Sequence, residues 1–225
     1  MRKHTPLFDQ RFPTASTGAS RATMWLSSLM LLGLASSCAV RAPTPGPQDR
    51  YLIWLGQGHR ADADAYAATL RNAGVGDVVP MFALTRSARS WRECAHDEFN
   101  LPPPELHANM VPTLQLLLRL KTDGLIDTTL ARSVYRPPDL NTCAGGSQRS
   151  RHLHNQAIDF DLPARADNVE KLCAFWREHG PAANMGLGFY TPTAIHIDTA
   201  GFRTWGEDHS KRTSLCLTPA EKAAV

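Results

Sequence analysis

Two histidines and two aspartates lie close together in the stretch SRHLHNQAIDFDLP, residues 150 to 163. His152 and Asp159 are seven residues apart there, and a later apolar stretch, AIHIDT, carries His196 and Asp198. Two imidazoles and one carboxylate, with a fourth position left for water, form the ligand set typical of a catalytic zinc site. A single histidine on a strand is more often a surface or core residue, so the combination is what predicts the site.

Both stretches alternate between apolar and polar residues. In AIDFDL, Ile158 and Phe160 fall on one face while Asp159 falls on the other, because strand side chains alternate with period two. AIHIDT repeats this pattern around His196. If the two strands pair in one sheet, Asp159 and His196 share a surface, and His152 reaches that surface from the preceding loop. The pattern predicts one packed face and one face that carries the metal.

Two helices are expected to cover the packed face. Residues 111–124 place Leu114 and further leucines at helical spacing, and residues 167–180 do the same around Leu172. Isoleucine and phenylalanine side chains of the strands can be buried against these helices. The sequence therefore predicts an α+β fold, with a small and mainly antiparallel sheet that has helices on one face.

The remaining elements are expected to lead into this sheet. Residues 51–83 form a lead-in segment with a helix over 61–74, followed by a strand-like apolar run over 78–84. This segment forms either a small subdomain or part of one core. A further strand then delivers Arg136 to residues 137–149, where prolines and glycines predict a loop without regular structure.

The N-terminal residues differ from the rest. The apolar run MWLSSLMLLGLA is short and follows Arg21, as in the core of a signal peptide, which we assign to residues 1–37. The small residues before Cys38 resemble a bacterial lipoprotein processing site. Cys38 then carries the lipid that anchors the protein to the membrane, and residues 38–50 are a Pro-rich tether. The alternative is cleavage nearby without a lipid. Either way we expect export to the periplasm or cell envelope.

The composition limits the binding partners to be expected and indicates the redox compartment of the protein. A formal net charge of +3 without a basic tract gives no reason to expect nucleic acid. Four cysteines remain after Cys38, an even number in an oxidising compartment, so two disulfides are expected. Three connectivities are possible, and we favour Cys94 with Cys143 and Cys173 with Cys216. Zinc binding by cysteines is the rival interpretation, but the chain has no close Cys-x-x-Cys pair.

These residues also resemble a known family, the zinc D-alanyl-D-alanine carboxypeptidases and endopeptidases, which are relatives of hedgehog domains and of phage peptidoglycan endopeptidases. The resemblance covers about Leu84 to Gly206 and implies the fold of that family for a peptidase domain over residues 84–217, followed by a tail over 218–225. A motif with this many fixed spacings is specific. It is carried by Ser133, Arg136, Asn141, Gly145, Gly146, Ser150, His152, Ala157, Asp159, His196 and Asp198.

The resemblance implies a role for each residue of the zinc site. His152, Asp159 and His196 would be the zinc ligands, and Asp198 would be the acid that takes the proton from the attacking water. Many relatives place an acid three residues before the last ligand, whereas here the acid follows His196. The reversed assignment, with Asp198 as the third ligand, therefore stays open.

The residues upstream would bind the substrate. Arg136 would hold the substrate's carboxylate or steady the oxyanion with its planar fork, and the alternative for it is a structural salt bridge. Asn141 and Ser150 would add hydrogen bonds to the substrate or to the ligands. Asn155 stands where the family usually has glycine, and asparagine tolerates the unusual backbone angles of that position.

The function predicted from the sequence is a zinc-dependent peptidase that cleaves stem or cross-bridge peptides of peptidoglycan, as a carboxypeptidase or an endopeptidase. Its partners would be peptidoglycan peptides, with membrane contact only through the lipid at Cys38. The alternative is a non-catalytic, zinc-containing module that binds the cell wall. The joint presence of the ligand set, Asp198 and Arg136 favours the enzyme.

Overall fold

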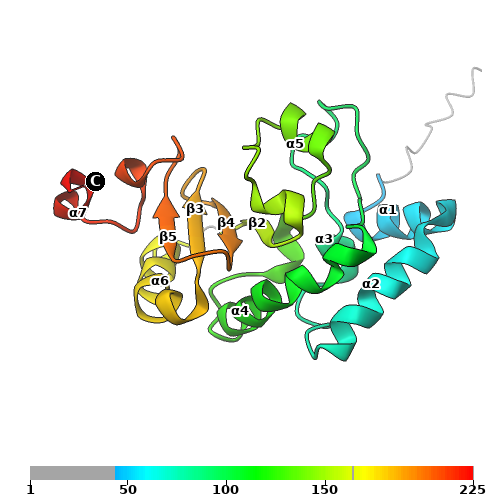
Figure 1. The fold of residues 1–225 in the computed structure, drawn as a ribbon, viewed down its shortest axis with the longest axis horizontal. Coiled ribbons are helices and arrows are strands. Elements are labelled where there is room, and N and C mark those ends of the chain that lie inside the picture. Colours follow the sequence, from blue (N-terminus) through cyan, green and yellow to red (C-terminus); the bar gives the residue numbers. More distant parts are fainter. Residues whose placement is uncertain (1–43, 164, 225) are drawn as a thin grey trace, which may run out of the picture. The chain divides into compact units, whose positions relative to one another are not determined.

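A five-stranded sheet lies at the centre of the computed structural model, which describes residues 44–163 and 165–224 (Figure 1). The strand order is β1-β2-β4-β3-β5, with antiparallel neighbours except for the parallel pair β3 and β5. The fold is therefore α+β with a mainly antiparallel sheet, as predicted. The strands are β1 (Ala131–Ser133), β2 (Ala157–Asp161), β3 (Gly186–Phe189), β4 (Ala194–Asp198) and β5 (Arg203–Trp205).

Strands β2 and β4 pair in the register that the alternation predicts. Asp159 lies directly opposite His196. On the other face, Ile158 and Ile197 are paired and fully buried. Apolar alternation fixes such a register because a slip of one residue would turn every apolar side chain to the wrong face.

Two helices cover the apolar face. Leu114 of α4 (Val111–Thr122) and Leu172 of α6 (Asn168–Ala183) belong to the same buried cluster as Ile158. Figure 1 shows both helices on one side of the strands. Helix α6 continues three residues past the expected end at Gly180 and stops at Asn184, which has the left-handed conformation that often ends a helix.

The lead-in segment shares this core. Tyr66 on α2 is fully buried in the cluster, and its hydroxyl accepts a hydrogen bond of 3.1 Å from Asn155. The strand expected over residues 78–84 is wrong, because Pro80 begins the short helix α3 there. The expected tether, residues 38–50, ends in the first turn of α1, where Arg50 forms an ion pair of 2.6 Å with Glu98. The helices of this segment are α1 (Pro47–Trp54), α2 (Arg60–Asn72) and α3 (Met81–Leu84).

The loop expected over residues 137–149 contains a helix. Helix α5 (Pro138–Cys143) starts with a proline at its first position, which costs no hydrogen bond there because the first N–H groups of a helix have no partner within it. The prediction of no regular structure was therefore wrong for its first half. The last helix is α7 (Pro219–Ala223).

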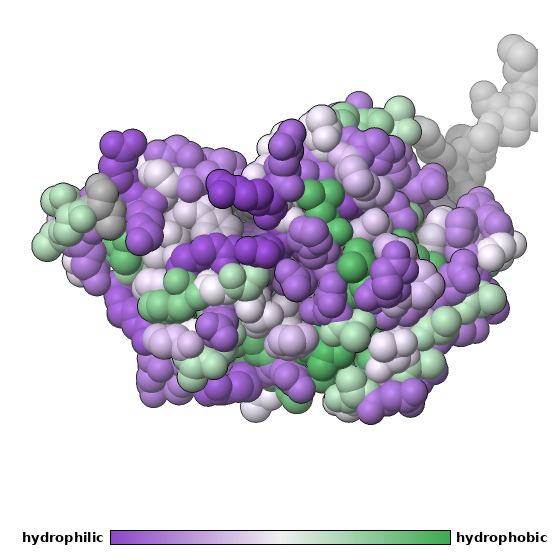
Figure 2. Space-filling view, in the orientation of Figure 1, coloured by the Kyte–Doolittle hydropathy of each residue, from purple (hydrophilic) through white to green (hydrophobic). Residues whose placement is uncertain are grey.

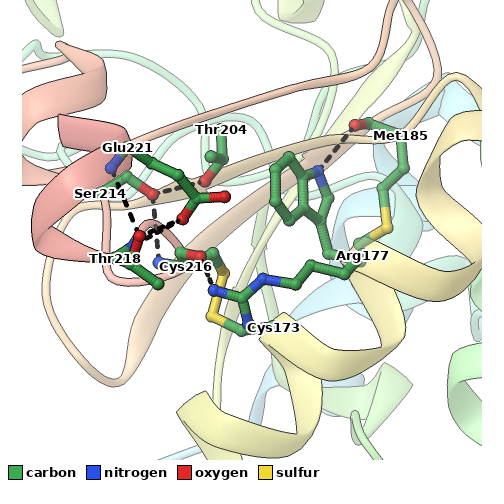
Figure 3. Close-up of a disulfide and its surroundings, with 9 residues drawn as sticks. Cys173, Arg177, Met185, Thr204, Ser214, Cys216, Thr218 and Glu221 are labelled. Atoms are coloured by element: carbon green, nitrogen blue, oxygen red, sulfur yellow. Dashed lines mark hydrogen bonds between the residues drawn. A yellow bond between two sulfur atoms is a disulfide. The ribbon is translucent and has the colours of Figure 1, made fainter. Parts of the chain in front are cut away.

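Two disulfides are present, and they have the favoured connectivity. Cys94 bonds to Cys143 at the end of α5, and Cys173 bonds to Cys216. Figure 3 shows the second bond joining α6 to the C-terminal segment, where Arg177 also donates to the carbonyl of Cys216. All four cysteines are consumed by these bonds, so they are not zinc ligands.

The expected signal peptide and Cys38 lie outside the described residues. Among the residues that are described, no helix combines the length and the apolar character needed to cross a bilayer.

Candidate metal centre

Three side chains on the polar face of the sheet direct one donor atom each toward a common point. Asp159 Oδ1 lies 2.9 Å from His196 Nδ1 and 3.2 Å from His152 Nε2, and the two nitrogens are 3.1 Å apart. The three residues are 1 %, 5 % and 1 % exposed in the order Asp159, His196, His152. We call them the metal group. They are the residues that the sequence predicts as ligands, and a short turn and two paired strands bring them together in a group that could hold a metal ion.

His152 is placed by a single turn of 3-10 helix, Arg151–His154, that precedes β2. Asn155 ends this turn at φ 52° and ψ 47°, the left-handed conformation that a glycine there would adopt freely. The Nδ1 atom of His152 lies 2.6 Å from the carbonyl oxygen of Val134, which accepts its proton. Nε2 is therefore left as the lone-pair atom that faces the metal group.

His196 is oriented from behind by Asp198. Its Nε2 lies 2.9 Å from Asp198 Oδ2, so Nδ1 faces the metal group. The carboxylate of Asp198 also accepts two bonds from Arg203, at 2.6 and 2.9 Å, and one of 2.8 Å from the backbone N–H of Ala200. Burial acts to raise the pKa of Asp198, but His196 and Arg203 hold that pKa well below its usual value. A carboxylate that orients a ligand histidine is a common support of metal sites.

This geometry does not suit the role of general base that was expected for Asp198. Its side chain is fully buried, and four donors occupy the four lone-pair positions that a carboxylate offers. It does not line the cleft described below. The same placement speaks against the reversed assignment, because Asp198 lies behind the ring of His196 rather than beside Asp159.

Charge within the metal group favours ionised Asp159 beside neutral His152. Burial would raise the pKa of Asp159, but the two histidines and Arg136 hold it well below its usual value. Burial, with a contribution from Arg136, lowers the pKa of His152 to about 4. Burial acts to lower the pKa of His196 as well, yet its hydrogen bonds to Asp159 and Asp198 raise it.

The donor set fits a zinc ion. With their outer nitrogens hydrogen-bonded to Val134 and Asp198, the two histidines present lone pairs to each other and to Asp159 Oδ1. Three acceptor atoms facing one another repel unless a cation lies among them, either a metal ion or the proton that the raised pKa of His196 favours in its place. Tetrahedral zinc with ligands at 2.0–2.1 Å needs donor atoms about 3.3 Å apart, close to the separations seen here.

Arg136 forms the structural salt bridge that was the alternative for it, and it also lines the cleft. Its Nη2 donates to Asp159 Oδ2 at 2.6 Å, and its Nε donates to the hydroxyl of Ser133 at 2.7 Å. These bonds use two of its five N–H donors, and the residue also lines the cleft. Arg136 thus holds the second oxygen of a ligand carboxylate and faces the space above the metal group.

The two other expected substrate-binding residues have mainly structural contacts. The Ser150 hydroxyl accepts from the backbone N–H of His152 at 3.3 Å, as the cap of the 3-10 turn, and Ser150 also lines the cleft. Asn141 is 2 % exposed and is not part of the cleft lining. It donates to the carbonyl of Ser147 and packs so closely on Gly146 that a side chain there would clash. Asn141 shapes the loop rather than reaching a substrate.

A cleft of about 990 Å³ lies above the metal group. Arg203 and Trp205 line it, and the ring centroids of Trp205 and His196 are 5.1 Å apart. Several lining residues were missed, among them His209, which has no partner at ligand spacing in the sequence, and Tyr190. The Tyr190 hydroxyl lies 3.3 Å from Asp159 Oδ1, and its only sequence signal is its position just after β3, the neighbour of β4.

Comparison with known proteins gives one result. Residues 87–198, about half of the chain, match the family model described as peptidase M15. The match begins beyond the lead-in helices and ends at Asp198, so it contains the whole metal group. No curated protein and no solved structure matches the chain.

Proposed function

The chain belongs, through residues 87–198, to the zinc-dependent peptidase M15 family, and from this premise we propose that it cleaves stem or cross-bridge peptides of bacterial peptidoglycan. The family and the metal group indicate a zinc metallopeptidase. The peptidoglycan substrate, with carboxypeptidase or endopeptidase action, is the proposal.

The observation that carries the proposal is the position of the metal group in the cleft. His152, Asp159 and His196 all line an opening large enough for several peptide residues. They would hold zinc, which when bound polarises a peptide carbonyl and lowers the pKa of water. A site with three protein ligands in an open cleft is typical of catalytic rather than structural zinc.

Two further residues face the reacting bond in this proposal. Arg136 fixes the ligand carboxylate and offers its remaining donors to a substrate carboxylate or to the oxygen of the scissile carbonyl. Burial raises the pKa of Tyr190, and Asp159 raises it further, so the phenol keeps its proton and can donate a hydrogen bond to the same oxygen.

A second candidate, a zinc-containing module that binds the cell wall without cleaving it, is favoured by one observation. Asp198 is saturated with hydrogen bonds, and Asp159 is the one carboxylate among the described residues that line the cleft. A general base of the usual carboxylate type is therefore lacking on the cleft surface.

We place the enzyme outside the cytoplasm, in the periplasm or cell envelope. The N-terminal sequence pattern supports export and a lipid at Cys38, and the two disulfides accord with an oxidising compartment. An anchored peptidase would act on the wall beside the membrane.

Peptidoglycan fragments incubated with the zinc-loaded protein, with product masses measured, test the proposal. We expect chelator-sensitive cleavage of a stem or cross-bridge peptide, lost in His152→Ala and kept in the control His154→Ala. His154 is exposed, lies on the same turn and is not part of the cleft lining. Intact fragments with one zinc per chain would instead support the binding module.

A further inference from the structure

We propose that the cleft selects peptides bearing free carboxylates on both sides of the reacting bond. Arg149 and Arg151 bind the carboxylate on one wall of the cleft, and Lys211 binds the carboxylate on the other wall. The inference rests on the proposed peptidase function and names the substrate class of the same site. It starts from the charges that line the cleft.

The cleft lining is strongly basic. Against one carboxylate, Asp159, the described lining contains six lysine and arginine side chains. A protein with a net charge of only +3 has therefore concentrated positive charge around its metal group. The six cations are Arg89, Arg136, Arg149, Arg151, Arg203 and Lys211.

Three of these cations have a carboxylate partner within the protein. Arg136 pairs with Asp159, and Arg203 pairs with the buried Asp198. The third, Arg89, lies 2.5 Å from an oxygen of Asp161. Each of these three residues thus has an internal partner that fixes its position, and Arg136 keeps donors free toward the cleft.

The other three, which we call the rim cations, have no such partner. Among the described residues, neither Arg149 nor Arg151 nor Lys211 forms an ion pair, and their side chains make no hydrogen bond. Arg149 and Lys211 are exposed, and Arg151 is half-buried. Their charges line a hollow. Solvent screens the attraction between a cation and a bound anion less in a hollow than on an open surface.

The rim cations lie on opposite sides of the metal group. Arg149 and Arg151 come from the segment between α5 and β2, beside the β1 end of the sheet. Lys211 follows β5, the strand at the other end. Figure 1 shows α5 and β5 on either side of β2 and β4, and Figure 2 shows strongly hydrophilic side chains around the hollow between these regions. A peptide across the metal group therefore meets positive charge on both sides of its scissile bond.

Carboxylates suit this arrangement. The guanidinium fork of arginine matches a carboxylate with two parallel hydrogen bonds, and a lysine adds a point charge. An amidated side chain presents N–H groups to the same cations and loses both the charge and half of the acceptors. The cleft should therefore discriminate between a free and an amidated form of one peptide.

The test uses one stem peptide in two forms, with its side-chain and terminal carboxylates either free or amidated. For the zinc-loaded protein, kcat/KM and the equilibrium binding constant are measured for each form. We expect the free form to be preferred by about tenfold or more, as three partly exposed ion pairs would give. In the triple variant Arg149→Gln, Arg151→Gln and Lys211→Gln this preference should fall several-fold, to the part that Arg136 alone supports, with zinc content unchanged.

A matched control removes three charges elsewhere, at the exposed Arg60 and Arg71 and the half-buried Lys222 (Arg60→Gln, Arg71→Gln and Lys222→Gln), and should keep the preference. The inference is overturned if the protein treats both forms equally or if the triple variant keeps the preference. It is also overturned if neither form binds while inorganic polyphosphate does, which would point to a phosphate polymer. Selective binding of the free form without any cleavage would support the inference and contradict the proposed peptidase activity alone.

Discussion

The metal group and the rim cations belong to one cleft but differ in where their partners lie. In the metal group, each histidine has its outer nitrogen bound by the protein, and the second oxygen of Asp159 is held by Arg136. The rim cations have no ion-pair partner among the described residues. The internal partners hold the side chains of the metal group in one geometry before any substrate binds. The rim cations have no such partner and can be paired by the negative charge of a bound ligand. We infer from this difference that the metal group performs the chemistry and that the rim cations select the substrate.

The largest expected effect comes from breaking the metal group. His196→Ala removes a ligand and leaves Asp159 buried with one less partner, so zinc binding and peptide cleavage should each fall by more than about a hundredfold. Zinc per chain after dialysis against a chelator measures the first effect, and product masses measure the second. Retention of one zinc per chain would mean that His196 is not a ligand.

Removing the support of a ligand should have a smaller effect. Asp198→Asn keeps the shape but loses the charge behind His196, so zinc affinity should fall by about 10–100-fold. Cleavage should return when zinc is raised to saturation. If cleavage stays lost at full zinc occupancy, Asp198 takes part in proton transfer after all, as the sequence resemblance implied.

Salt concentration should affect the rim cations more than the metal group. The screening length is about 10 Å at 0.1 M salt and about 3 Å at 1 M, so attraction between the rim cations and an anionic peptide should weaken. We expect KM to rise several-fold over that range, with little change in kcat and in zinc affinity. If salt changed the zinc affinity and left KM constant, the assignment of substrate binding to the rim cations would be contradicted.

The smallest effect is expected at Ser150, which lies between the two regions. Ser150→Ala removes the cap of the turn that carries His152, so the free energy of unfolding should fall by about 1 kcal/mol. Zinc content and the preference for free carboxylates should stay unchanged. Denaturant unfolding measures the first quantity, and a large rise in KM would show that Ser150 binds substrate directly.

The sequence predicted what depends on local pattern. Alternation in β2 and β4 was enough to place Asp159 opposite His196, because one apolar face fixes the register. The disulfides were predictable from an even cysteine count and their places along the chain. Helical leucine spacing identified α4 in the same way.

The features that the sequence missed depend on tertiary contacts. Asp198 is saturated with hydrogen bonds because the chain after β4 returns along β3 and brings Arg203 onto its carboxylate, which no spacing rule reveals. Tyr190 faces the site only because β3 pairs with β4. Helix α3 replaces the expected strand since Pro80 begins a turn that packs the same apolar residues against the core.

X-ray absorption at the zinc edge tests the central claim most directly, because it identifies the atoms bound to zinc in the loaded protein. We predict nitrogen and oxygen neighbours at about 2.0–2.1 Å with the signature of two imidazoles, and one imidazole fewer in any zinc-loaded His152→Ala protein. Sulfur neighbours at about 2.3 Å, or a spectrum unchanged by that substitution, would contradict the assignment of His152, Asp159 and His196 as the metal group.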